Sequence, residues 1–343
     1  MKKFFSFFLT TIAFYAFAEP VKQLEKLYDV LLLIALPASG KSEVRKFIDK
    51  LPKEEVQKYF NMKDIVQLDD FPYVHLMRRI YQELRNMNQD PIFFISDVLP
   101  FKNAFEWGSL TTLLNEDFDD LINNRIVGSN NSTDWLFERF DRVRSKLGLG
   151  KAFENMSKDT KNLLAKAIQQ DVVKFVDSKN EEVKKGYLNK TIIIEFARGG
   201  AYGSTMPLPK PYGYEYSISL LKDEILKNAS IFYIWVDPQE SRRKNEKRAD
   251  PNDPGSILHH SVPLAVMYND YGLDDFDYLI KKSRVNNHIE ITSNGSTYFI
   301  PAVRFDNRID KTSFIRDTYW EKENVNLLKD ELIEAFKPIV SIQ

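Results

Sequence analysis

The chain contains no cysteine and only four histidines. The absence of thiols excludes a disulfide framework, a thiolate nucleophile and any zinc or iron–sulfur site with cysteine ligands. The histidines do not form a His-x-x-Glu-His or similar ligand pattern, so a zinc centre is not expected. An excess of either charge is also missing, since Lys+Arg 48 against Asp+Glu 49 gives a net charge of -1. This balance provides no electrostatic reason to expect a nucleic acid as the main partner.

The chain has 343 residues, of which 43% are hydrophobic and 28% are charged. This composition is typical of a globular protein, and the length suits one large α/β domain or two ordinary ones. No internal repeat, low-complexity tract or long linker divides the sequence. We therefore expect one folded unit.

The first twenty residues have the pattern of a secretory signal. Lys2 and Lys3 precede an apolar run from Phe4 to Ala18, which ends in a small-x-small triplet. The run is shorter than the roughly 20 residues that a spanning helix needs, so no permanent membrane span is expected. An N-terminal helix packed on the domain, or a wrongly chosen start codon, explains the same residues. We treat residues 1–20 as a signal-like segment.

Four short segments are candidate strands, and all except Asp64–Leu68 have the apolar pattern of strands that are buried on both faces of a parallel sheet. They are Tyr28–Leu36, Asp64–Leu68, Thr191–Phe196 and Ile231–Val236. Helical patterns alternate with these runs, which predicts βαβ crossovers. The helical patterns cover Ser42–Leu51, Tyr73–Met87 and Lys222–Lys227. A hairpin around Asn294-Gly295 and a helix at Asn324–Phe336 complete the predicted elements.

Residues 91–190 contain no comparable strand. Their apolar residues recur at helical spacing in three segments. These segments are Phe105–Leu121, Trp135–Leu147 and Leu163–Val176. We therefore expect a helical insertion at 91–190, between a first part of the core at 21–90 and a second part at 191–343.

The segment from Ala35 to Ser42 fits the Walker A pattern, with alanine in place of the first glycine. It follows a predicted buried strand and opens a predicted helix, as this loop requires. Small residues let successive backbone N–H groups approach phosphate oxygens closely, and the helix N-terminus favours an anion. Lys41 is expected to bind the β- and γ-phosphates, and Ser42 to offer its hydroxyl to Mg²⁺. The competing interpretation is a strand–turn–helix in which Lys41 is a solvated surface charge.

With proline at its third place, Leu36-Pro37-Ala38-Ser39-Gly40-Lys41-Ser42 resembles the loop of P-loop small-molecule and polynucleotide kinases. This group includes polynucleotide 5′-hydroxyl kinases and zeta-type toxin kinases. The resemblance covers residues 28–90 and 190–250, and it implies an α/β P-loop NTPase fold with ATP and Mg²⁺ as cofactors. We expect a mainly parallel five-stranded sheet flanked by helices. The predicted nucleotide-binding residues are Pro37, Ala38, Ser39, Gly40, Lys41 and Ser42.

Asp69 and Asp70 stand at the end of the second predicted strand. Kinases of this group carry an Asp pair here, so the resemblance makes Asp69 the general base for the acceptor hydroxyl and Asp70 a candidate substrate contact. A carboxylate within hydrogen-bond reach can accept that proton. The competing interpretation is that the pair stops the strand and caps the next helix. The group's arginine after the pair is missing near Pro72, so Arg78 or Arg79 would have to substitute.

Residues 237–248 are rich in positive charge. In the kinase group, the corresponding helix is a lid whose arginines close over the phosphates. The resemblance therefore makes Arg243 and Arg248 catalytic candidates, because phosphoryl transfer depends mostly on positioning and charge neutralisation. A solvated helix face explains the same run of charges.

Three further residues are candidates. Glu195 ends a strand where the group normally has the Walker B Asp, and it is a candidate for a magnesium-bound water. A polar strand-end residue is the alternative. Arg198 lies in the glycine-rich turn that follows and is a candidate substrate or phosphate contact. His259 is a candidate for the acceptor pocket beside the lid.

The leading hypothesis is an ATP-dependent kinase that moves the γ-phosphate to a hydroxyl of an unidentified small-molecule or polymer acceptor. A nucleotide-binding sensor or interaction protein without transfer activity is one alternative. An exported zeta-toxin-like kinase is another, because it would reconcile the signal-like segment with ATP chemistry. The scarcity of ATP outside cells favours a cytoplasmic location. The absence of an Asn-Lys-x-Asp box favours adenine over guanine nucleotides.

Overall fold

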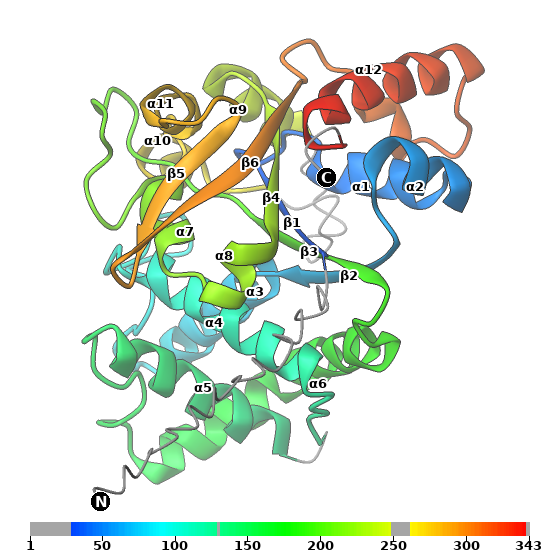
Figure 1. The fold of residues 1–343 in the computed structure, drawn as a ribbon. Helices are drawn as coiled ribbons and strands as arrows, with labels where there is room; N and C mark the ends of the chain where they lie inside the picture. The colour runs from blue at the N-terminus through cyan, green and yellow to red at the C-terminus, as the bar shows by residue number, and fades with distance from the viewer. Residues whose placement is uncertain (1–28, 129–130, 248–260, 341–343) are drawn as a thin grey trace, which may run out of the picture.

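The computed structural model describes residues 29–128, 131–247 and 261–340. Within these residues the centre is a sheet of six strands in the order β2-β3-β1-β4-β6-β5 (Figure 1). The strands are β1 (Asp29–Ile34), β2 (Asp64–Asp69), β3 (Lys190–Phe196), β4 (Ala229–Trp235), β5 (His288–Ser293) and β6 (Ser296–Asp306). Neighbouring strands are parallel except for the antiparallel β5–β6 pair at the edge. The expectation of five strands is too low, because both strands of the predicted hairpin join the sheet.

Different helices cover the two faces of the sheet, because side chains alternate between the faces along each strand. In β1, Leu32 and Ile34 belong to one buried cluster, while Leu31 and Leu33 belong to the other. The first face is covered by α4 (Glu106–Ile122), α7 (Gly213–Ser219), α8 (Asp223–Asn228) and α11 (Phe276–Lys282). The second is covered by α1 (Lys41–Asp49), α2 (Lys53–Phe60) and α12 (Lys322–Val340), which lie together in Figure 1.

The segment between β2 and β3 is helical. It contains α3 (Phe71–Asn86), α4, α5 (Ser132–Lys146) and α6 (Lys158–Lys185). Helix α4 contributes Leu114 and Phe118 to the cluster on the sheet, and Leu110 and Leu113 to a separate cluster with α3, α5 and α6. The helical segment therefore packs continuously with the sheet.

The carboxyl ends of β1, β2, β3 and β4 lie along the same side of the sheet, because these strands are parallel; this side is called the carboxyl edge below. The central strand β1 has β3 on one side and β4 on the other. The connections that follow therefore run to opposite sides of β1, which makes the end of β1 a topological switch point. Open α/β sheets bind ligands at such a point. Helices α9 (Pro238–Lys247) and α10 (Leu264–Asn269) follow β4, and the short 3₁₀ helix η2 (Ser313–Arg316) follows β6.

In the three described ranges, no helix is both long and apolar enough to cross a bilayer. The signal-like segment at residues 1–20 lies outside these ranges.

Candidate functional site

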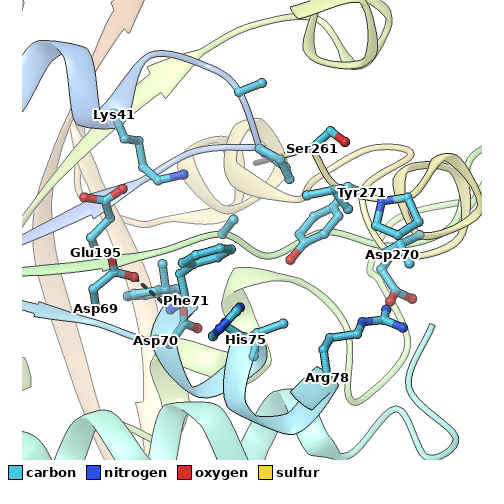
Figure 2. Close-up of a pocket in the computed structure, with 18 of the residues that line it drawn as sticks. Lys41, Asp69, Asp70, Phe71, His75, Arg78, Glu195, Ser261, Asp270 and Tyr271 are labelled. Carbon is cyan, nitrogen blue, oxygen red and sulfur yellow. Dashed lines mark hydrogen bonds between the residues drawn. The ribbon is translucent and has the colours of Figure 1, made fainter. Parts of the chain in front are cut away.

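A cavity of about 740 Å³ lies at the carboxyl edge of the sheet, and two regions line it. The loop half consists of residues 37–43 with Asp69, Asp70 and Glu195. The aromatic half consists of the remaining lining residues, among them Phe71, Val74, His75, Arg78, Phe94, Phe101, Trp107, Asp270 and Tyr271. Figure 2 shows Lys41 and the carboxylates of Glu195 and Asp69 across the cavity from Arg78 and Asp270.

The backbone of the loop is bent by two residues in the left-handed region. Ala38 has a φ of 56° and Gly40 a φ of 103°, on either side of Ser39. Turns of this kind gather backbone N–H groups into an anion-binding concavity. A Cβ on Gly40 would lie 2.5 Å from Thr312 Oγ1, so both the conformation and the space at this position require glycine. The loop is therefore a tight turn between β1 and α1, and phosphate binding by it stays a prediction.

Neighbouring elements hold the loop through its carbonyl groups. Asn307 Nδ2 donates to the Ser39 carbonyl at 2.7 Å, and Ser241 Oγ donates to the Pro37 carbonyl at 2.7 Å. Ser39 Oγ closes the turn by donating to the Leu36 carbonyl at 2.7 Å. Sequence analysis did not identify Asn307 or Ser241, because they reach the loop only through the fold. These contacts fix the loop before any ligand arrives.

Lys41 and Ser42 begin α1 and line the cavity. The Lys41 ammonium donates to the Ala35 carbonyl at 3.3 Å, at the end of β1. In Figure 2 its side chain extends from the loop toward Glu195. The structure thus brings the lysine, the serine and the strand-end carboxylates into one half of the cavity.

Asp69 and Glu195 are direct neighbours, because they are paired in register at the ends of β2 and β3. Asp69 Oδ1 accepts a hydrogen bond from the Phe71 N–H at 2.9 Å. Burial raises the pKa of Asp69 to about 8, and the negative charges of Glu195 and Asp70 add to this effect. Glu195 is contacted by Gln67 Nε2 at 3.4 Å and by Arg45 Nε at 3.8 Å. The pair therefore contains one carboxyl that holds a proton near neutral pH.

Asp70 and Arg198 form a buried ion pair. Arg198 Nη1 donates to Asp70 Oδ2 at 2.6 Å, and its other nitrogens donate to Ser217 on α7 and Thr111 on α4. Arg198 is 2% exposed and does not line the cavity. The expectation that Arg198 contacts a substrate does not match this position, because the guanidinium is enclosed between the sheet and two helices.

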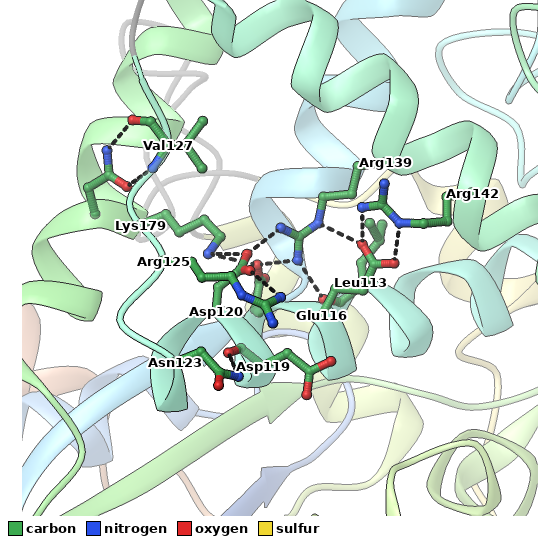
Figure 3. A network of polar contacts seen from close by, with 12 residues as sticks. Leu113, Glu116, Asp119, Asp120, Asn123, Arg125, Val127, Arg139, Arg142 and Lys179 are labelled. Carbon is green, nitrogen blue, oxygen red and sulfur yellow. Dashed lines mark hydrogen bonds and ion pairs between the residues drawn. The ribbon is translucent and has the colours of Figure 1, made fainter.

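A buried network of charges joins α4, α5 and α6 (Figure 3), and α3 is attached to it. Arg139 is 1% exposed and donates to both Asp117 and Asp120 at 2.7 Å. Lys179 Nζ lies 2.8 Å from Asp120 Oδ2. Tyr73 on α3 donates its hydroxyl to Asp117 at 2.9 Å. Because α3 starts directly after β2, this network gives the carboxylates at the strand end a rigid support.

The described part of α9 presents no arginine to the cavity. Arg243 instead makes two bonds of 2.6 Å to Glu240 on the exposed side of the helix. The expectation that Arg243 faces the phosphates is not met, because Ser241 occupies the side of α9 that touches the loop. Arg248 and His259 lie outside the described residues.

The aromatic half is built from segments far apart in the sequence. Phe94 stacks on Phe101 with ring centroids 4.5 Å apart, and Trp107 contacts Phe101 and Tyr271 at 5.0 and 5.5 Å. The Arg78 guanidinium lies 3.5 Å from the Phe94 ring centroid. No local motif marks the aromatic residues, and the sequence assigned none of them to the site, whereas Arg78 was one of the two possible substitutes for the missing motif arginine. Arg79, the other possible substitute for the missing motif arginine, is paired with Asp171 at 2.9 Å.

No family model matches the chain, and no curated protein or solved structure matches it significantly. Over the described ranges, no group of three or more acidic or histidine side chains is placed to hold a metal ion. The functional assignment therefore depends on the geometry of the cavity.

Proposed function

We propose that the protein is an ATP-dependent phosphotransferase of the P-loop kinase type. The observation that carries this proposal is the loop at 37–42. It joins a buried strand to a helix, contains two left-handed residues, and opens on a cavity in which a lysine faces strand-end carboxylates. This half offers a triphosphate the groups that bind it in such loops, namely backbone N–H groups, the N-terminus of α1 and the ammonium of Lys41.

The donor set of the loop half fits magnesium bound together with a nucleotide. Mg²⁺ usually takes one or two carboxylates, with substrate phosphates and waters completing its shell. Ser42 and Glu195 both line the cavity and would hold the ion. When bound, the ion would neutralise phosphate charge.

In the proposed reaction, the acceptor hydroxyl oxygen forms a bond to the γ-phosphorus, and the bond from that phosphorus to the β–γ bridging oxygen breaks. ADP leaves with the electron pair of the broken bond. Asp69 accepts the hydroxyl proton. Lys41 holds the β- and γ-phosphates and offsets the charge that collects on the leaving oxygen. Arg243 has no part in this scheme.

One observation favours the alternative of a nucleotide-binding protein without transfer activity. The Asp69 carboxyl has a pKa of about 8 without ligand, so it is mostly protonated at pH 7. A protonated carboxyl cannot act as the base. A nearby positive charge lowers the pKa of a carboxyl. The kinase proposal requires that Mg²⁺, bound with the nucleotide, lowers the pKa of Asp69 enough to ionise it, whereas the binding-protein proposal does not.

Nucleotide binding is tested by calorimetric titration of ATP with Mg²⁺ into wild type and Lys41→Ala. We expect ATP affinity to fall at least about tenfold in the variant, the usual effect of losing a charged hydrogen bond. Lys184→Ala is the matched control, because Lys184 is an exposed lysine paired with Glu181 on α6. Equal ATP affinity in wild type and Lys41→Ala contradicts the proposal.

A further inference from the structure

Asp270 is a buried carboxylate in the wall of the cavity. It follows α10, lines the aromatic half and is 2% exposed. Among the residues that the structure describes, its Oδ2 atom has no hydrogen-bond partner. Burial raises the pKa of Asp270 to about 7, and only the charge of Arg78 opposes this effect. Leaving a buried carboxylate without a partner is costly, so this position is suited to a ligand that supplies a donor.

Arg78 does not supply that donor. Its Nη1 and Nη2 atoms donate to the carbonyls of Ser96 and Leu99 at 2.7 and 2.8 Å, and its guanidinium stacks on Phe94. Figure 2 shows Arg78 beside Asp270, across the cavity from Lys41. The arginine is thus held by the 96–99 segment and makes no hydrogen bond to Asp270, a residue of the cavity wall whose Oδ2 atom is buried.

The other charges of the aromatic half do not favour an anionic ligand. Arg79 is paired with Asp171 and Glu83, and burial lowers the pKa of His75, which disfavours its charged form. Asp97 adds a further carboxylate at the exposed rim. Among the described lining residues of this half, no cation is left without a partner for a phosphate or carboxylate of the acceptor.

Aromatic rings complete the surroundings of Asp270. Tyr271 follows it directly, and the Trp107 and Phe101 rings continue the wall. A carboxylate beside aromatic rings is a chemical environment that binds ammonium groups well, through charged hydrogen bonds and cation–π attraction.

We propose that Asp270 binds a protonated amino group of the acceptor, so that the acceptor is an amino alcohol in the broad sense, acyclic or a sugar. The transfer to its hydroxyl depends on the proposed kinase function, whereas the binding of its amino group does not. The hydroxyl would point to Asp69 in the loop half and the amino group to Asp270 in the aromatic half.

Binding of matched probes to the full chain, measured by calorimetry, tests this proposal. One arm compares glucosamine with glucose, and the other compares ethanolamine with ethylene glycol. We expect the amino member of at least one pair to bind about ten to a hundredfold more tightly, and the better arm distinguishes a cyclic from an acyclic acceptor. N-acetylglucosamine, which lacks the charge, is expected to bind as weakly as glucose.

Asp270→Asn keeps the size of the side chain and is expected to abolish the preference for the amino member. Asp177→Asn is the matched control, since Asp177 is exposed on α6 and outside the cavity lining. Lys41→Ala is expected to lose ATP affinity and keep the amine preference, which separates the two proposals. Equal binding within both pairs, no saturable binding of either amine, or a preference that survives in Asp270→Asn overturns the proposal. Amine preference without ATP-dependent product would leave Asp270 as an amine site and remove the kinase function instead.

Discussion

The loop half and the aromatic half of the cavity differ in how the chain builds them. The loop half takes its proposed phosphate-binding groups from one contiguous segment, residues 37–43, which is bent at Ala38 and Gly40. The aromatic half is assembled from α3, the 94–107 segment and residues 262–271, which meet only in the folded protein. In the proposed function, the residues that would bind a triphosphate are therefore mostly neighbours in the sequence, whereas those that would select the acceptor meet only through tertiary packing.

The largest expected effect comes from Asp69→Asn, which tests whether the loop half does more than bind. Losing a general base typically costs about 10²–10⁴ in rate, so we expect kcat to fall by that factor while ATP affinity is retained. Steady-state ADP release and ATP titration measure the two quantities. Turnover that is unchanged by the substitution would show that Asp69 is not the base, whereas absence of turnover in wild type favours the binding protein without transfer.

A smaller effect is expected for Gly40→Ala, which tests the local backbone. The left-handed conformation costs an alanine about 1–2 kcal/mol, and the new Cβ would also meet Thr312 Oγ1 at 2.5 Å. We expect a lower melting temperature and ATP binding weakened about tenfold. Gly148→Ala is the control, because Gly148 has a φ of 73° with nothing within 4 Å of the added Cβ. If both variants bind ATP as wild type does, the loop conformation is not what holds the nucleotide.

The pH dependence of stability tests the environment of Asp69 without any ligand. Folding raises the pKa of this carboxyl from 3.8 to about 8. Its stabilising contribution is therefore fully present below about pH 4 and is lost as pH rises through about 8. We expect the unfolding free energy of wild type, relative to Asp69→Asn, to fall between pH 5 and 8 in denaturant titrations. A difference that stays constant with pH would show that Asp69 is not in the buried acidic setting described.

The smallest effect is expected for Arg243→Ala. This variant tests whether Arg243 stays in its observed exposed position during the reaction or acts on the phosphates as a lid residue would. Its guanidinium is paired with Glu240 on the exposed side of α9. Because exposed ion pairs contribute little, we expect kcat to change by less than about twofold and the melting temperature to change little. A loss of kcat comparable with that of Asp69→Asn would mean that α9 rearranges over the nucleotide.

The sequence predicted the elements that have strong local signals. The buried strands at Tyr28–Leu36 and Thr191–Phe196 appear as β1 and β3, because a continuous apolar run has no exposed face. The six-stranded count was missed, since pairing of β6 with β4 depends on long-range contacts. Within the site, Asp69 and Glu195 could be identified because each is a carboxylate at the end of a predicted strand. Arg198 was misplaced because a turn residue gives no sign of whether its side chain is enclosed by α4 and α7.

The most direct test of the central claim is a structure determined with a non-hydrolysable ATP analogue and Mg²⁺. The account predicts that the triphosphate lies against the backbone N–H groups of residues 38–42, with Lys41 on the β- and γ-phosphates and the γ-phosphorus facing Asp69. A triphosphate bound elsewhere, or in the aromatic half with the loop unoccupied, contradicts it.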